Sequence, residues 1–154
     1  MTISLTSPVS GSAQTGFTAP TYTVVQDTAP AWNGKQYAVT AVGGTQTGVD
    51  INSVSKPFTT TFFKPQVLKS LPQPSPAGVY RSVPINQYKL LTRKGGSPAA
   101  NQAAIPFKVE TVIQVPAGVD TYEPEEVRAA LSLHIGCLTQ MSAGIGDTVV
   151  TGVM

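Results

Sequence analysis

Hydrophobic and polar residues alternate along two segments in the middle of the chain. NQYKLLTRK and FKVETVIQV each place most of their charged and amide residues at every second position, with mainly apolar residues between them. Because successive side chains of a β-strand point to opposite faces, each segment predicts a strand with one apolar and one polar face. We therefore expect an antiparallel sheet with one side covered and the other open to solvent. The polar side carries Gln87, Lys89, Leu91, Arg93, Lys108, Glu110, Val112 and Gln114.

Shorter strand patterns precede these two segments, and turn residues separate them. TYTVVQ, KQYAVTAV and PFTTTFFKPQVL are rich in the β-branched and aromatic residues of strands. We expect GGTQTG to end the second of these strands, and Pro57 and Pro65 to confine the third between them or to force a bulge. The proline-rich KSLPQPSPAGVY predicts an extended loop. The sheet thus occupies residues 20–115, and the Ser- and Thr-rich residues 1–19 form an edge hairpin or an arm.

A single strong helical pattern follows the strands. Its apolar residues recur at spacings of three and four, which places them on one stripe of a helix. We predict a helix over residues 121–143 that begins at a Thr or Asp cap before Pro124 and ends at Gly144 and Gly146. A short tail, residues 144–154, remains as a turn of helix or a strand. The stripe consists of Val127, Ala130, Leu131, His134, Ile135, Leu138 and Met141.

One helix is too little to cover the apolar side of five or six strands. A second copy of the chain would supply the missing cover if the helices of each partner lay over the sheet of the other. We therefore expect a homodimer. Its packing residues on the helix would be Val127, Leu131, Ile135 and Leu138.

The composition favours a protein whose surface is covered by copies of itself. The chain has 154 residues, enough for one domain with a core. Charged residues make up 12% of it, about half the usual share. Few charges are available to keep a lone monomer soluble. The net charge of +2 is weak for a monomeric nucleic-acid binder, but small charges add up when many copies line one surface.

Residues that could carry enzyme chemistry are few. His134 and Cys137 are the only histidine and the only cysteine, and both lie on or beside the apolar stripe. A zinc site needs four such ligands and a catalytic cysteine needs an oriented base, so we interpret both as packing residues. Glu123, Glu125 and Glu126 fit the first turn of a helix, where carboxylates are favoured. We expect no enzyme activity, no metal and no cofactor.

The sequence also predicts where the protein is made. One cysteine excludes an intrachain disulfide. The segment MTISLTSPVSGSAQ lacks the basic and apolar regions of a signal peptide. No apolar run reaches the roughly 20 residues that cross a bilayer. We expect a soluble protein made in a cytoplasm, with no membrane partner.

The stretch LLTRKGGSPAANQAAIPF predicts a long hairpin tip over Thr92–Ala104. The alternating segments on both sides argue against a domain linker. A phosphate-binding loop needs its lysine after the glycines and then a helix. Here Lys94 precedes Gly95 and Gly96, and a strand follows.

Six residues of the polar side are candidate nucleic-acid ligands. Lysine and arginine supply positive charge to phosphates, and amides bond to bases or sugars. The alternative is the ordinary polar side of a half-exposed sheet. The candidates are Gln87, Lys89, Arg93, Lys108, Glu110 and Gln114.

The order of these parts resembles the coat proteins of single-stranded RNA bacteriophages. The resemblance extends from about Thr21, and VIQVPAGVDTYEPEEVRAALSLHIGCL carries most of it, where a strand, a proline loop and a helix follow one another. It implies an α+β fold with an N-terminal hairpin and a five-stranded antiparallel sheet. One or more C-terminal helices would pack across an interlocked homodimer.

The resemblance also implies a function. Dimers of such proteins build an icosahedral shell, usually of T=3 type, around a single-stranded RNA genome bound to the inner side of the sheet. The protein would then be part of a virion assembled in the cytoplasm of a bacterial host. Copies of the tip would meet around the symmetry axes through Lys94, Gly95, Gly96, Ser97, Pro98 and Asn101. Two other classes stay open, a tail or decoration protein of a phage and a non-viral β-rich binding module.

Overall fold

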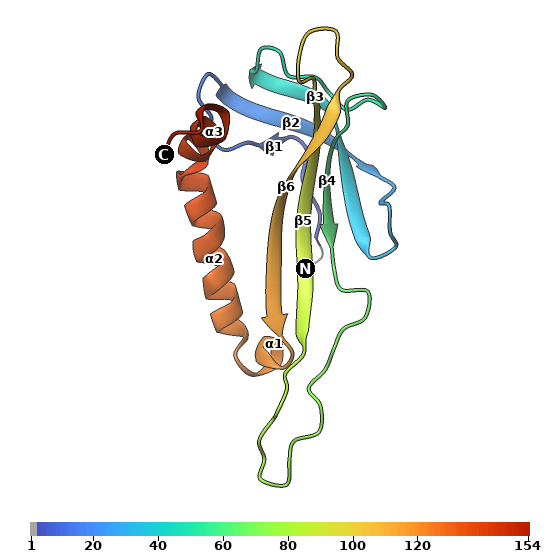
Figure 1. Ribbon diagram of the computed structural model, residues 1–154, viewed down its shortest axis with the longest axis vertical. Helices are drawn as coiled ribbons and strands as arrows, with labels where there is room; N and C mark the ends of the chain where they lie inside the picture. Colours follow the sequence, from blue (N-terminus) through green and yellow to red (C-terminus); the bar gives the residue numbers. More distant parts are fainter. Residues whose placement is uncertain (1–2) are drawn as a thin grey trace.

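The computed structural model describes residues 3–154, which form a six-stranded antiparallel sheet with helices on one side (Figure 1). The strands lie in sequence order, so each pairs with its neighbours along the chain. They are β1 (Val9–Ser10), β2 (Thr18–Asp27), β3 (Gly34–Thr45), β4 (Phe58–Phe63), β5 (Ile85–Gly96) and β6 (Ile105–Pro116). The predicted α+β class, an antiparallel sheet with C-terminal helices, is confirmed, whereas packing across a homodimer stays a prediction. The N-terminal segment contributes β1, a two-residue strand at the edge of the sheet.

The β5–β6 hairpin is longer than the sequence indicated. Its register runs without interruption from Ile85 opposite Pro116 to Gly96 opposite Ile105. The predicted tip was therefore too wide, because Lys94, Gly95 and Gly96 belong to β5. The tip is confined to residues 97–104. Glycines are poor strand formers in general, but Gly95 donates its backbone N–H to Pro57 O at 2.7 Å, which holds the strand in place.

Strand β3 also continues past the point where the glycines were expected to end it. It runs through Gly43 and Gly44 to Thr45. At Gly44 the φ angle is +73°, and a Cβ there would contact the backbone carbonyls of Thr18 and Ala19 in β2. The register between β2 and β3 shifts in this region. The glycine therefore permits a close approach of two strands, a requirement that turn statistics do not reveal.

Three helices follow β6, namely α1 (Val119–Tyr122), α2 (Pro124–Gln140) and α3 (Ser142–Thr151). The prediction of one helix over residues 121–143 was wrong at both ends. Glu123 interrupts the start with non-helical angles, and Pro124 takes the first position of α2. Gly144 and Gly146 do not end the helix, because they lie inside α3, so the tail is helical. The break falls at Met141.

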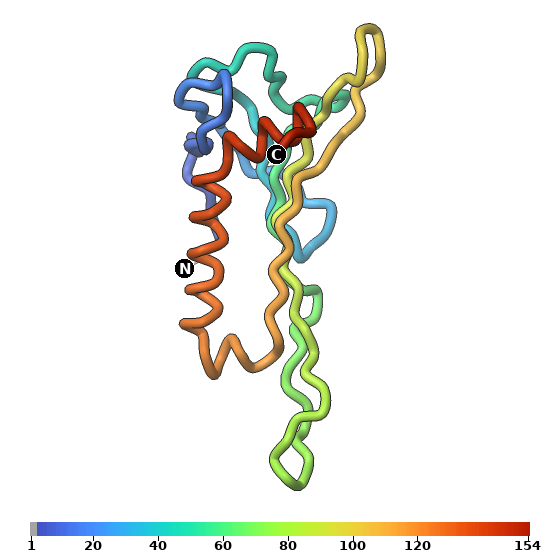
Figure 2. Tube along the Cα trace, turned by 60° about the vertical axis from the view of Figure 1, so that its left-hand side comes forward, coloured from blue at the N-terminus to red at the C-terminus, as the bar shows by residue number. Residues whose placement is uncertain are grey.

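The helices cover the sheet loosely. Figures 1 and 2 both show α2 standing apart from the sheet, attached through α1 at one end and α3 at the other. Within the described part of the chain, α2 and α3 contain no buried residue. The core of the chain is instead a small cluster of Val24, Tyr37 and Val39 between β2 and β3. A single chain therefore leaves most of its helix-facing apolar surface uncovered.

A long loop, residues 64–84, projects from the end of the sheet between β4 and β5 (Figure 1). The buried Asn86 fixes its base. Its amide donates to Lys69 O at 3.0 Å, and its Oδ1 accepts from Lys69 N at 2.9 Å. Ser75 N donates to Val79 O at 2.9 Å, and Val79 N donates to Ser75 Oγ at 3.1 Å, which closes the far turn. Within residues 3–154, no helix is both long and apolar enough to cross a membrane.

Candidate nucleic-acid interface and assembly surfaces

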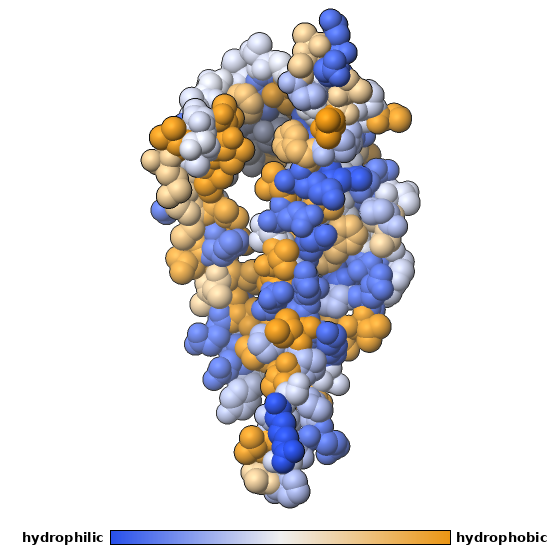
Figure 3. All heavy atoms as spheres, in the orientation of Figure 1, coloured by the Kyte–Doolittle hydropathy of each residue, from blue (hydrophilic) through white to orange (hydrophobic). Residues whose placement is uncertain are grey.

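The register of the β5–β6 hairpin brings all six predicted nucleic-acid ligands onto one side of the sheet. The directly opposite pairs are Gln87 with Gln114, Lys89 with Val112, Leu91 with Glu110, and Arg93 with Lys108. Figure 3 shows hydrophilic side chains gathered along these two strands, with hydrophobic ones between them. We call this side of β5 and β6 the polar face.

Buried hydrogen bonds support the neighbouring strands on the same side. Thr61, which lies opposite Leu91, is almost fully buried and donates through Oγ1 to Gln36 Oε1 at 2.9 Å. The Gln36 amide donates in turn to Asp27 Oδ2 at 2.7 Å. Arg93 donates through Nε to Thr59 Oγ1 at 3.4 Å. These bonds fix the floor from which the charged side chains of the polar face project.

The electrostatics of the polar face are mixed. Lys89, Arg93 and Lys108 supply three positive charges, and Glu110 one negative charge. Lys89 Nζ lies 3.7 Å from Glu110 Oε1 and 5.7 Å from the centre of the Phe63 ring. Because both partners of this ion pair are partly exposed, it contributes little energy and leaves Lys89 able to exchange partners.

A second group beside the polar face was not predicted from the sequence. Lys64 lies with its Nζ 5.7 Å from the centre of the Trp32 ring, and the Trp32 side chain is 73% exposed. Asn33 donates its amide to Lys64 O at 2.6 Å, and Lys64 N donates to Asn33 O at 3.0 Å. A groove of about 360 Å³ joins this group to Gln87 and Lys89. The available signal was the lone tryptophan in a turn, which has no place in a strand pattern.

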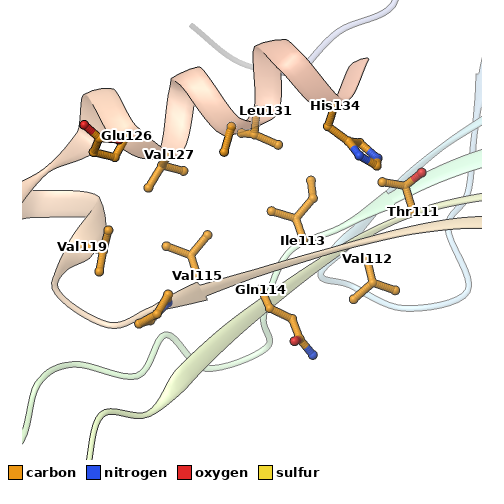
Figure 4. A pocket seen from close by; sticks show the side chains of 12 residues that line it. Thr111, Val112, Ile113, Gln114, Val115, Val119, Glu126, Val127, Leu131 and His134 are labelled. Carbon is orange, nitrogen blue, oxygen red and sulfur yellow. The ribbon is translucent and has the colours of Figure 1, made fainter. Parts of the chain in front are cut away.

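The opposite side of β6 faces α2 across an apolar cavity of about 440 Å³. Figure 4 shows Val115 and Ile113 of β6 pointing toward Val127 and Leu131 of α2, whereas Gln114 points away. His134 also lines this cavity but is exposed in the single chain, so its interpretation as a packing residue stays a prediction. Two of the predicted dimer-packing residues thus face the chain's own sheet. The other two, Ile135 and Leu138, are 60% and 40% exposed.

The predicted inter-subunit loop divides into a fixed part and an exposed part. Lys94 donates through Nζ to Asp50 O at 2.8 Å and lies 4.8 Å from the centre of the Phe58 ring. Burial lowers the pKa of Lys94. By contrast Ser97, Pro98 and Asn101 are exposed in the tip. The fixed part also includes Gly95, and Gly96 is paired within the strand.

Chains of solved virus-like particles resemble this one. No model of a protein family and no curated protein matches the sequence. The chain is similar to that of a virus-like particle of bacteriophage ESE020, with a TM-score of 0.97 and 53% identity over 99% of this chain and 100% of that chain. Virus-like particles of Beihai levi-like virus 32 and Wenzhou levi-like virus 4 share the fold at a TM-score of 0.50 and at 16% and 14% identity. These matches cover 92% and 93% of this chain, and 90% and 85% of those chains. The chain therefore belongs to the coat proteins of levivirus-type RNA bacteriophages, a family of structural proteins, and is a component of the virion.

Proposed function

We propose that this coat protein forms an interlocked homodimer that assembles into a closed icosahedral shell of T=3 type around a single-stranded RNA genome. The observation that carries the proposal is the difference between the two sides of β6. One side presents charges and amides to solvent, and the other borders an unfilled apolar cavity beneath a loosely attached helix. The first side suits RNA and the second suits another copy of the chain.

The dimer would form along β6. This twelve-residue strand lies at the end of the strand order, so its outer backbone groups have no strand partner among the described residues. A long exposed edge is a ready template for pairing with another chain. On its helix-facing side Val109 is 63% exposed and Phe107 is 55% exposed. Pairing two β6 strands would join the sheets and bring each α2 over the partner's uncovered apolar side.

RNA would bind to the polar face of the joined sheet. Lys89, Arg93 and Lys108 would contact phosphates, and Gln87 and Gln114 would contact bases or sugars. Glu110 reduces the charge of each copy, so affinity would come from many copies acting together. The exposed Trp32 beside Lys64 would add a surface on which an unpaired base can stack.

The tip would make contacts between dimers. Ser97, Pro98 and Asn101 project beyond the paired part of the hairpin, and the strand below them is fixed. Identical chains could therefore make different contacts around the symmetry axes by changing the tip alone.

Production of the protein in a bacterial cytoplasm tests this function. We expect uniform particles by electron microscopy that contain host RNA protected from nuclease. After gentle disassembly, native mass spectrometry should show dimers. Small oligomers without RNA would contradict the proposed shell, and a stable folded monomer would contradict the dimer.

A further inference from the structure

The last helix is tied to a turn near the N-terminus of the same chain. Gln14 donates through Nε2 to Ser142 O at 2.9 Å and to Ser142 Oγ at 2.7 Å. Thr15 donates through Oγ1 to Asp147 Oδ2 at 2.9 Å. At Gly146 an added Cβ would collide with the Gln14 side chain. We call these five residues the clasp.

The clasp closes the chain into a ring. From Gln14 the backbone passes through strands β2 to β6, α1 and α2 to Ser142, and the clasp returns it to Gln14. Figure 2 shows α2 as one side of this ring, with the sheet as the other. In the space-filling view an opening separates α2 from the sheet (Figure 3). The side chains of a single chain therefore do not fill the ring.

Apolar surface lines the interior of the ring. The cavity of about 440 Å³ beneath α2 is one part of it. A second cavity, of about 450 Å³, lies between Gln14 of the clasp and sheet residues that include Val39, Phe58 and Val109. An occupant must therefore be largely apolar, because leaving this surface in water is unfavourable.

We infer that the ring of each chain closes around helix α2 of the partner, so that the two chains of the dimer are linked. This inference rests on the homodimer proposed above. Pairing through β6 would bring the partner's α2 to the helix-facing side of this sheet, where the ring lies. Helix α2 suits enclosure, because Val127 and Leu131 face its own sheet while Leu133, Ile135 and Leu138 are exposed.

The clasp then acts as a latch. While both rings are closed, the two chains can neither join nor separate, so both steps require at least one of the two clasps to open. Its hydrogen bonds are partly or fully exposed, and such bonds contribute modestly to stability. The clasp therefore controls the rate of subunit exchange more than the equilibrium between monomer and dimer.

A covalent clasp tests the linkage directly. Thr15→Cys and Asp147→Cys would be combined in a Cys137→Ala background, and assembled particles would be treated with a short bis-maleimide and dissolved in SDS. Linked rings should migrate as dimers, in a fraction equal to the square of the fraction of closed chains. Either single-cysteine variant, treated alike, should yield monomers.

Isotope labelling establishes which chain contributes each cysteine. Particles would be refolded from a mixture of ¹⁵N-labelled and unlabelled chains before cross-linking. We expect each cross-linked peptide pair to come from one chain, because the clasp is intrachain. Pairs of mixed isotope composition would overturn the inference, as would monomers in SDS after efficient cross-linking. If efficient cross-linking gives only monomers in SDS, native mass spectrometry of untreated particles after gentle disassembly separates two outcomes. Dimers there would leave the proposed homodimer standing, whereas their absence would refute both the homodimer and the linkage.

A second variant avoids new cysteines. Gln14→Ala combined with Asp147→Ala should accelerate subunit exchange between isolated dimers on the order of tenfold or more. Gln102→Ala, at an exposed position in the tip, serves as the control and should leave the rate unchanged. Equal exchange rates for the unmodified protein, the clasp variant and the control would overturn the inference that the clasp acts as a latch.

Discussion

At the scale of single residues, the polar face combines a fixed floor with charged side chains that are exposed or half-buried. Thr61 and Gln36 are buried and bonded to each other, and their positions are set by folding. Lys108 is exposed and has no such constraint. If RNA binds to the polar face as proposed, this division would allow the protein to bind RNA of many sequences without losing the shape of its sheet.

A triple variant in which alanine replaces Lys89, Arg93 and Lys108 should package less RNA. Under the proposed function, each lost cation would remove a phosphate contact and its release of counterions, so the dependence of particle stability on salt should also weaken. RNA content is measured by absorbance and by extraction from purified particles. A matched variant would remove the same charge elsewhere, at Lys69, Arg81 and Arg128, and should retain more RNA. Equal RNA loss in the two variants would refute the assignment of the polar face.

Asp27 should make folding stability depend on pH. Hydrogen bonds from the Gln36 side chain and the Thr28 backbone lower the pKa of Asp27. A lowered folded-state pKa stabilises the protein above the unfolded value of about 3.9, and this stability is lost as pH falls toward the folded value. Asp27→Asn should therefore flatten the loss of stability below about pH 4, measured by denaturant unfolding. Lys56 lowers the pKa of Asp50. This second carboxyl would therefore preserve part of the dependence of stability on pH in the variant. An identical pH profile in the variant would contradict this role.

At the scale of elements, the two glycines of α3 differ in their surroundings. Nothing lies within 4 Å of a Cβ added at Gly144, whereas one at Gly146 would meet Gln14. Helix termination signals in a sequence are local, so both glycines looked alike. The structure shows that Gly146 serves a contact with the other end of the chain.

Gly144→Ala should stabilise the protein by about 0.5–1 kcal/mol, because alanine favours a helix more than glycine does. Gly146→Ala should lose this gain or destabilise the protein, since it displaces the clasp. The two variants serve as matched controls in thermal unfolding at equal concentration. Equal stabilisation in both would show that the clasp contributes nothing.

The glycine pair of β5 permits a similar comparison. A Cβ at Gly95 would lie 2.7 Å from the Lys56 backbone, whereas one at Gly96 would make an ordinary contact with the Phe107 ring. Gly95→Ala should destabilise the hairpin base by roughly 1–3 kcal/mol and reduce the yield of uniform particles. Gly96→Ala should be tolerated. Electron microscopy and unfolding measurements distinguish the two, and the reverse order would contradict a fixed hairpin base.

At the scale of the whole molecule, much of the architecture could be predicted from periodicity. The alternation in β5 and β6 predicted the correct face for each side chain, because strand geometry is local. A shift of the register by one residue would move every side chain to the other face of the sheet. Trp32 was missed because its environment depends on Lys64, which follows β4 and is distant in the sequence. The clasp was missed for the same reason, since nothing near Gln14 in the sequence indicates a helix beyond Ser142. Contacts between distant segments leave no periodic signal.

The small core of one chain predicts that stability depends on concentration. Val24, Tyr37 and Val39 alone cannot support a domain of this length, so burial between chains would supply most of the stabilisation. The thermal midpoint of disassembled protein should therefore rise with protein concentration. A midpoint that does not change with concentration would indicate a self-sufficient monomer.

The clasp also imposes an order in time. It joins positions separated by 128 and 132 residues, so its second half emerges from the ribosome long after the first. While a chain is being made the ring stays open, and neighbouring nascent chains on one messenger RNA lie close together. Synthesis itself thus provides the interval in which a partner helix can enter. Dilute refolding removes that interval, because a lone chain can close its ring before it meets another.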